Sequence, residues 1–459
     1  MRLATNKRSR IVHIVLVCAV LLGALGITAA PVSANQYPDF CELGDYVGGQ
    51  YLICVPPGIG WNGDLVVYAH GYVAPENPIA IPEDQLVLPD GTSIPETILG
   101  LGYAFAATSY RTNGLAVEHG VTDLVELVDM FKDLSDPDPG HVYLVGASEG
   151  GLNTALAVEQ EPDVFDGGVA ACGPVGDFHR QTNYWGDVRV LFDYFFRDVE
   201  ENPLPPFTPD ALLAPQEVID NWYRCDDPDR NGNYPCTELS SPYYPGYQTR
   251  LGGALANNPE QTEQLLKVAN VPVNTDDPEA NVEALVQILW YSVFAFGDAM
   301  EKLDGQPYDN KHRWYSGSGN DRLLNHPKKG VERFKADKDA LEEIEAHYQT
   351  SGELDAPLVT MHTTGDPTVP YWHEPLYRAK VWANRDWWRH INLPILRYGH
   401  CNFEPEEVLF AFTLLRLQVE GFTLLNASDV LTTDQYRDYE RLMERHELIP
   451  SLEDSGVSW

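Results

Sequence analysis

Residues 142–151 read VYLVGASEGG and place Ser148 between glycines directly after an apolar run. The four residues from Val142 to Val145 predict a buried strand, and the residues that follow the serine predict a helix. On such a strand-to-helix turn a serine hydroxyl is exposed at the end of a sheet, and glycines on either side avoid clashes. The stretch therefore predicts either a nucleophile or a glycine-rich turn that only packs closely, and the remaining sequence decides between them.

The rest of the chain predicts a mostly parallel sheet flanked by helices. Apolar runs alternate with segments of helical periodicity from Asp64 to Cys172, and the alternation returns at Pro357. Such alternation is typical of βαβ units, whose strands are parallel. The expected strands are 65–69, 103–108, 142–145, 167–171, 357–362 and 393–398. The expected helices are 117–134, 152–158, 374–384 and 405–419.

A long segment interrupts this alternation. Residues 173–354 are rich in aromatic residues, prolines and acids. We therefore expect a core domain made of residues 35–174 and 355–459, and a large, mainly helical lid of residues 175–354 inserted after the sixth strand. The helix-like pieces of this insertion are residues 261–268, 282–300 and 331–347.

Two later strands lead to residues that would activate Ser148. The strand expected at 357–362 is followed by Asp366, and the strand expected at 393–398 is followed by His400. In hydrolases that carry the nucleophile on this kind of turn, the acid and then the histidine follow the serine along the chain. This order favours the catalytic interpretation. The other histidines after Asp366 precede a strand, begin a helix or lie in a charged tail: His390, His373 and His446.

These residues have defined roles in acyl transfer. Ser148 would be the nucleophile, His400 the general base, and Asp366 the carboxylate that orients the imidazole. The sequence HGY ends an early strand at Tyr72, and Glu149 directly follows the serine. We expect the backbone N–H groups of Tyr72 and Glu149 to form the oxyanion hole.

The first 34 residues are typical of an export signal. A basic start precedes an apolar run over residues 11–27, and residues 32–34 (VSA) offer a small-residue cleavage site. We expect residues 1–34 to be removed and the mature protein to be secreted, either extracellular or periplasmic. The alternative is a retained membrane anchor, since about 17 apolar residues approach the length of a span. No stable membrane span is expected after cleavage.

The charge of the chain excludes some partners. The 459 residues include 31 basic and 68 acidic residues, which give a formal net charge of −37. Removal of the signal takes away four basic residues and no acidic one, so the mature net charge would be −41. Such a surface repels phosphate backbones and anionic lipids. We therefore expect a small-molecule or polymeric substrate and no nucleic acid.

Six cysteines remain after the signal, an even number that predicts up to three disulfides in an exported protein. The two pairs that are close in sequence, Cys41 with Cys54 and Cys225 with Cys236, are the local predictions. Their pairing would leave Cys172 with Cys401. The alternative for each cysteine is a buried free thiol.

Residues 227–238 fit the pattern D-x-[DN]-x-[DN]-G-x₅-E of a calcium loop. This pattern predicts a structural Ca²⁺ site, although Pro235 is unusual in it. An acidic turn closed by Cys225 and Cys236 is the alternative. No cofactor is expected for catalysis. The expected calcium ligands are Asp227, Asp229, Asn231, Asn233 and Glu238.

With HGY, GASEGG, GDPTVP and GHC in this order, the chain resembles the α/β-hydrolase superfamily over most of its mature length. The pieces SEGG at 148–151, PDVFDG at 162–167 and HC at 400–401 are similar to landmarks of the tannase and feruloyl esterase family, which includes a terephthalate monoester hydrolase. This resemblance implies an aromatic-ester substrate and a calcium-binding lid.

One residue departs from that family. Its members have bonded cysteines beside both the serine and the histidine, whereas Ala147 precedes the serine here. Cys172, at the end of the next strand, would then be the partner of Cys401. The sequence predicts a secreted serine hydrolase that cleaves carboxylic esters, including aromatic ones, through an acyl-enzyme. The alternatives are an aminopeptidase-like serine peptidase of the same fold, a polyester depolymerase, or a binding protein without catalytic activity.

Overall fold

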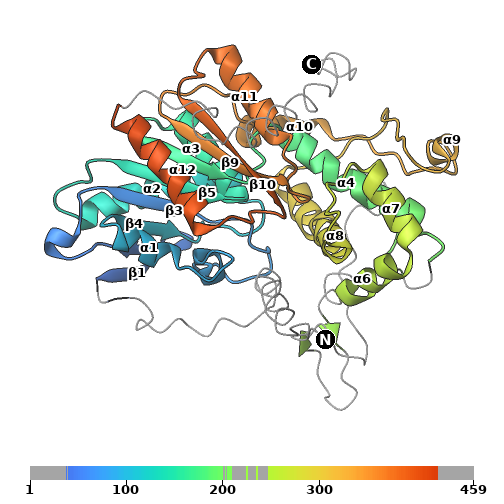
Figure 1. Ribbon diagram of the computed structural model, residues 1–459, viewed down its shortest axis with the longest axis horizontal. Coiled ribbons are helices and arrows are strands. Elements are labelled where there is room, and N and C mark those ends of the chain that lie inside the picture. Colours follow the sequence, from blue (N-terminus) through green and yellow to red (C-terminus); the bar gives the residue numbers. More distant parts are fainter. Residues whose placement is uncertain are drawn as a thin grey trace, which may run out of the picture.

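The computed structural model describes residues 38, 40–199, 202, 204–208, 224–225, 234–235 and 247–421. Its centre is an eight-stranded sheet of order β1-β2-β4-β3-β5-β6-β9-β10 (Figure 1). The neighbouring strands from β4 to β10 pair in parallel, whereas β2 pairs antiparallel with both of its neighbours, β1 and β4. The mostly parallel sheet is thus confirmed. The strand bounds are β1 Cys41–Tyr46, β2 Gly49–Cys54, β3 Leu65–Ala69, β4 Ala104–Thr108, β5 Val142–Ala147, β6 Gly167–Ala171, β9 Leu358–Gly365 and β10 His390–Tyr398.

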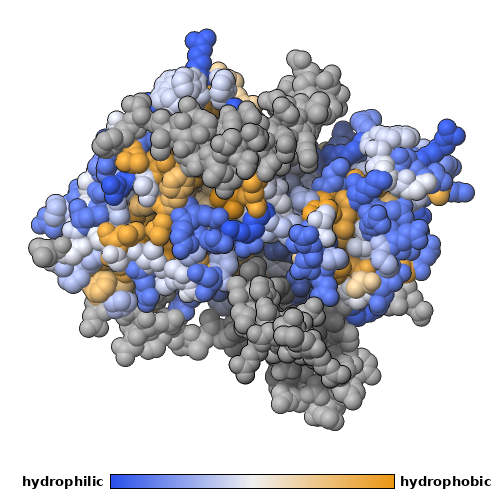
Figure 2. Space-filling model, viewed as in Figure 1, coloured by the Kyte–Doolittle hydropathy of each residue, from blue (hydrophilic) through white to orange (hydrophobic). Residues whose placement is uncertain are grey.

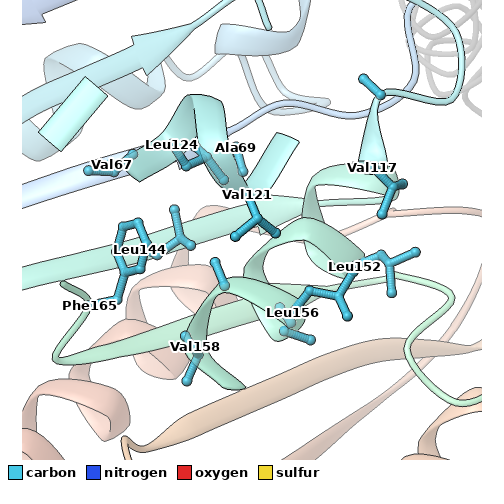
Figure 3. Close-up of a cluster of buried hydrophobic side chains, with 14 of the residues drawn as sticks. Val67, Ala69, Val117, Val121, Leu124, Leu144, Leu152, Leu156, Val158 and Phe165 are labelled. Carbon is cyan, nitrogen blue, oxygen red and sulfur yellow. The ribbon is translucent and has the colours of Figure 1, made fainter. Parts of the chain in front are cut away.

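Helices cover both faces of the sheet because successive side chains of each strand point to opposite faces. Val66 of β3 packs with α1 (Ile94–Gly100) and α12 (Pro405–Val419) on one face. Val67 packs on the other face. Figure 3 shows this second cluster, in which Val121 and Leu156 belong to helices that cover β3 and β5. The helices on this face are α2 Val117–Leu134, α3 Glu149–Gln160 and α11 His373–Asn384.

The described part of the chain between β6 and β9 consists largely of helices and the segments that join them, and it lies beside the sheet (Figure 1). A separate hydrophobic cluster holds much of it together, with Phe192, Leu255 and Leu289 among its buried members. The helices are α4 Phe178–Phe195, α6 Tyr247–Asn257, α7 Pro259–Val268, α8 Pro278–Lys302, α9 Asp321–Leu324 and α10 Lys338–Glu343, and a π turn follows at Ile344–Tyr348. A two-stranded pair, β7 Arg224–Cys225 with β8 Tyr234–Pro235, also lies in this segment.

Helix α8 bears on the expected absence of a membrane span. Among the helices in the described part of the chain, it alone has the length and hydropathy of one. However, 61% of its apolar window is buried within the fold, as in a helix that packs inside a protein. Burial thus weakly favours a core helix of the insertion.

Several expectations lie outside the described residues. These are the signal peptide at 1–34, the disulfide between Cys225 and Cys236, and the calcium ligands Asp227, Asp229, Asn231, Asn233 and Glu238. The disulfide between Cys41 and Cys54 is present, and the two residues face each other across the β1–β2 hairpin.

Candidate active site

Ser148 lies on a sharp turn between β5 and α3. Its backbone has φ 57° and ψ −120°, a conformation that L residues rarely adopt. The neighbouring glycines are required by space, because a Cβ on Gly146 would lie 2.1 Å from the carbonyl oxygen of Gly150. A Cβ on Gly150 would lie 2.0 Å from the carbonyl oxygen of Ala69 on β3. The turn therefore presents the Ser148 side chain at the carboxyl end of the sheet.

The three residues predicted to act together form one hydrogen-bonded chain. His400 Nε2 lies 2.9 Å from Ser148 Oγ, and His400 Nδ1 lies 2.7 Å from Asp366 Oδ2. Asp366 directly follows β9, and His400 follows β10, so strand ends of one parallel sheet bring the three residues together. A carboxylate accepts hydrogen bonds, so Nδ1 of His400 donates and Nε2 accepts from the serine hydroxyl. This is the tautomer that a general base requires.

The loop after β9 fixes Asp366. Its Oδ1 accepts hydrogen bonds from the backbone N–H groups of Thr368 and Val369, both at 2.9 Å. Its side chain is fully buried. Burial alone would raise the pKa of Asp366, but the charges of His400 and His362 and their hydrogen bonds lower it below the ordinary value. Asp366 is therefore a carboxylate with a fixed orientation.

The predicted oxyanion donors lie on either side of the serine. In the described part of the chain, the backbone N–H groups of Tyr72 and Glu149 donate to no protein acceptor. A Cβ on Gly71 would lie 3.2 Å from the Cβ of Ser148, so this loop passes directly beside the serine. Gln85 holds the loop: its Oε1 accepts from Gly71 N at 2.7 Å, and its Nε2 donates to Tyr72 O at 3.1 Å.

The side chain of Glu149 is buried against a neighbouring loop. Its Oε1 accepts from Ala116 N at 3.1 Å, and the adjacent Leu115 N donates to Asp298 Oδ2 at 2.6 Å. Burial raises the pKa of Glu149 to about 8. The Glu149 carboxyl thus supports the loop that precedes α2, while its backbone N–H stays beside the serine.

A disulfide joins Cys172 to Cys401, which confirms the pairing predicted for these two cysteines. Cys172 directly follows β6, and Cys401 directly follows His400, so the bond ties the histidine loop to the end of the strand beside β5. Cys401 Sγ lies 3.4 Å from His400 Nε2. These two cysteines and His400 also have the spacing of metal ligands. Because both sulfurs are consumed by the disulfide, no thiolate remains to bind a metal there.

Helices of the insertion contact the loop that carries Asp366. From α4, Trp185 Nε1 donates to Thr368 O at 3.1 Å, and Tyr184 Oη donates to Pro367 O at 2.6 Å. Beside these contacts the ring of Trp185 stacks on that of Tyr291 from α8, with centroids 5.0 Å apart. The insertion therefore helps to build the site.

Two more side chains close this aromatic group. Tyr72, on the loop after β3, packs edge-to-face on Tyr291 at 5.6 Å and on Trp290 at 5.8 Å. Burial raises the pKa of Tyr291, and the charges of Glu149 and Asp366 raise it further. Tyr72 Oη and Trp290 Nε1 are buried and have no hydrogen-bond partner among the described residues.

Sequence reasoning missed two residues of this site. Gln85 lies on a short 3₁₀ turn, Glu83–Leu86, and no motif marks it. His362 lies within a strand, four residues before Asp366, and contacts its carboxylate. A histidine inside an otherwise apolar strand was the available signal, because a buried imidazole needs polar partners.

Comparison with known proteins gives one family match and several similar solved structures. The profile of the prolyl oligopeptidase family matches residues 99–187, a segment that contains the Ser148 turn. No curated protein matches the chain in sequence. Feruloyl esterase B from Aspergillus oryzae is similar in structure, with 14% identity, coverage of 82% of this chain and 79% of that one, and a TM-score of 0.44. Candida antarctica lipase A is similar as well, with 12% identity, coverage of 82% of this chain and 74% of that one, and a TM-score of 0.37.

An acylaminoacyl peptidase from Pyrococcus horikoshii is also similar, with 13% identity and a TM-score of 0.34. The alignment covers 88% of this chain but 43% of the peptidase, so the chain spans less than half the length of that protein. The sheet order, the Ser148 turn and the family match confirm the α/β-hydrolase fold. The chain is a serine hydrolase of this fold.

Proposed function

We propose that this serine hydrolase cleaves carboxylic esters through an acyl-enzyme. The observation that carries the proposal is the continuous chain of hydrogen bonds from Ser148 through His400 to Asp366. Ser148 Oγ attacks the ester carbonyl while His400 Nε2 takes its proton, and the N–H groups of Tyr72 and Glu149 bind the oxyanion. His400 then gives the proton to the departing alcohol. A water molecule, deprotonated by His400, releases the acid and restores Ser148.

The aromatic group around the site supports an ester of an aromatic acid. The rings of Tyr72, Trp185, Trp290 and Tyr291 offer faces and edges for a planar acyl group. A buried polar atom without a partner costs free energy, so Tyr72 Oη and Trp290 Nε1 favour a ligand that supplies polar atoms. Esters of feruloyl, gallate-like or terephthalate-like acids have this chemistry, in line with the family that the sequence resembles.

A peptidase is the second candidate, because the prolyl oligopeptidase profile matches the segment that carries Ser148. The same nucleophile and base would then attack an amide. A polyester depolymerase would use the same chemistry on a polymer surface.

One substrate panel separates these candidates. We expect wild type to hydrolyse p-nitrophenyl acyl esters and methyl ferulate, with kcat/KM highest for the aromatic acid, and to leave aminoacyl anilides intact. Ser148→Ala should lose at least ~10³-fold in kcat, since a triad nucleophile cannot be replaced. Ser93→Ala is the matched control, because Ser93 only caps α1.

The other outcomes of the panel are also informative. Selective anilide cleavage would assign a peptidase, and release of acids from polyester film without cleavage of soluble esters would assign a depolymerase. A wild-type protein that hydrolyses nothing and does not react with a fluorophosphonate probe would contradict catalysis altogether.

Secretion and calcium binding are part of the proposal. Both rest on sequence: the signal at 1–34, and the acidic pattern from Asp227 to Glu238. N-terminal sequencing of the exported protein should begin after residue 34. Isothermal titration of chelated protein with Ca²⁺ should show one site, and Asp227→Asn should remove it.

A further inference from the structure

We propose that His362 is a positioning residue for Asp366: as a buried imidazolium it holds the carboxylate against His400 and offsets its negative charge, which extends the activity to acidic pH. The proposal rests on the esterase function proposed above. His362 touches neither the serine nor a substrate, and its action passes through Asp366.

The geometry of His362 requires a cation. The side chain is fully buried on β9. Nε2 lies 2.7 Å from Val369 O and 3.3 Å from Asp366 Oδ2, while Nδ1 lies 3.2 Å from Glu374 Oε1. Both ring nitrogens therefore face oxygen atoms. A neutral ring would turn one lone pair toward an oxygen, whereas an imidazolium donates from both nitrogens.

The second carboxylate, Glu374, is fully engaged. Its Oε2 accepts from Thr360 Oγ1 at 2.6 Å and from Asn392 Nδ2. These two donors stabilise Glu374 as an ionised carboxylate. Because both bind Oε2, Oε1 still accepts from His362. The buried ionic group thus contains two carboxylates, Asp366 and Glu374, and one imidazolium.

The charge balance explains the effect on His400. With His400 neutral, the two carboxylates and His362 sum to one negative charge. When His400 takes the serine proton, the group becomes neutral. Without the charge of His362, the two carboxylates would be uncompensated, and one of them, Asp366, lies directly against His400. Loss of the His362 charge should therefore confine the activity to a higher pH range.

The electrostatics agree with this arrangement. Burial disfavours the charged imidazole, but the hydrogen bonds and charges of Asp366 and Glu374 outweigh burial and raise the pKa of His362 to about 10. The neighbouring His373 is affected oppositely, because burial and the charge of His362 hold its pKa well below the ordinary value. The titratable groups around His362 on β9, its loop, α11 and β10 are Asp366, Tyr371, His373, Glu374, His390 and His400.

A pH profile tests the proposal. In His362→Gln we expect the acidic limb of kcat/KM for p-nitrophenyl acetate to move upward by about one pH unit, because one buried positive charge is lost. At pH 5 the variant should therefore lose about tenfold in activity relative to wild type beyond any loss at pH 8. His390→Gln is the matched control, since His390 is half-buried beside the same strand but does not touch Asp366; its limb should coincide with that of wild type.

A second measurement does not depend on activity. In ¹⁵N-histidine-labelled Ser148→Ala protein at pH 7, the His362 ring nitrogens, assigned by their loss in His362→Gln, should resonate as an imidazolium. A neutral-imidazole signal, or an unchanged acidic limb in a folded and active His362→Gln, would overturn the proposal. If His362→Gln does not fold, the assignment comes from a nuclear Overhauser contact to the Tyr371 ring, and the protonation state still decides. Failure of the wild type to cleave any ester would instead contradict the proposed function.

Discussion

Gln85 determines which backbone groups of the loop after β3 remain without a hydrogen bond among the described residues. Its amide uses the N–H of Gly71 and the carbonyl of Tyr72, so the intervening N–H of Tyr72 is the donor left beside Ser148. A single side chain with both a donor and an acceptor thus holds the peptide groups on both sides of the one that carries the Tyr72 N–H. An oxyanion hole depends on such fixed donors, because they need no reorganisation when charge develops.

We therefore expect Gln85→Ala to lower kcat for p-nitrophenyl esters about tenfold with little change in KM, since removal of a whole donor costs about 10²-fold or more. Gln418→Ala is the matched control, because the Gln418 amide also donates to a backbone oxygen but lies on the exposed end of α12. Steady-state kinetics of both variants provide the measurement. An unchanged kcat in Gln85→Ala would mean that the loop keeps its direction without this side chain.

The sequence alone revealed the site residues that directly follow strands. Ser148, Asp366 and His400 each come after an apolar run, and the shared edge of a parallel sheet then brings them within hydrogen-bond distance. Gln85 and His362 were missed for a different reason. Gln85 lies in an irregular segment with no periodicity, and the role of His362 depends on Glu374, which arrives from a helix twelve residues later.

The elements that meet at the site are tied by the bond between Cys172 and Cys401. It joins the end of β6 to the turn after β10, and both cysteines have positive φ, 48° and 49°. The bond lies beside the base, whereas the disulfide between Cys41 and Cys54 lies in the β1–β2 hairpin at the opposite edge of the sheet. The two bonds therefore make a matched pair, one near the chemistry and one far from it.

We expect the double variant Cys172→Ala with Cys401→Ala to lose both stability and activity. Loss of a native disulfide costs about 2–5 kcal/mol, and the His400 loop also loses its attachment to the sheet. The double variant Cys41→Ala with Cys54→Ala should lower the melting temperature but leave kcat near the wild-type value. Thermal unfolding and kcat of the two variants, measured side by side, test this. Equal kcat in both would show that His400 is held by Asp366 and its loop alone.

The sequence predicted helices that have one buried face and strands that are buried on both faces. The strands β3 to β6 and helices α2 and α12 lie where periodicity placed them, since the central strands are apolar and the helices have a buried stripe. Helix α4 was not expected. Its buried residues include Gln181, Asn183 and Arg189 as well as aromatic side chains, so its sequence shows no apolar face. The hairpin β1–β2, at one edge of the sheet, was also missed, because its two antiparallel strands are short and partly polar.

The whole molecule carries far more acidic than basic residues. Its formal net charge is −37 at pH 7, and its sequence pI is about 4.5. Figure 2 shows hydrophilic groups over much of the visible described surface, with apolar groups gathered near α12 on the left and over the helices between β6 and β9 on the right. Most cations of the described ion pairs each neutralise one neighbouring acidic side chain at most; Arg397, for example, is shared by Glu404 and Glu407. A large uncompensated negative charge therefore remains, and it opposes the compact state.

Added salt should therefore stabilise the protein near neutral pH. Because the Debye length falls from about 14 Å at 0.05 M to about 3 Å at 1 M, sodium chloride screens the repulsion between surface carboxylates. We expect the melting temperature at pH 7.5 to rise by a few degrees, on the order of 1–2 kcal/mol for a chain of this size. At pH 4.5, where the net charge is close to zero, this gain should vanish, because there is no net repulsion to screen. Glucose at the same osmolality controls for effects of any solute. A melting temperature that does not change with salt at pH 7.5 would show that local ion pairs already balance the acidic surface.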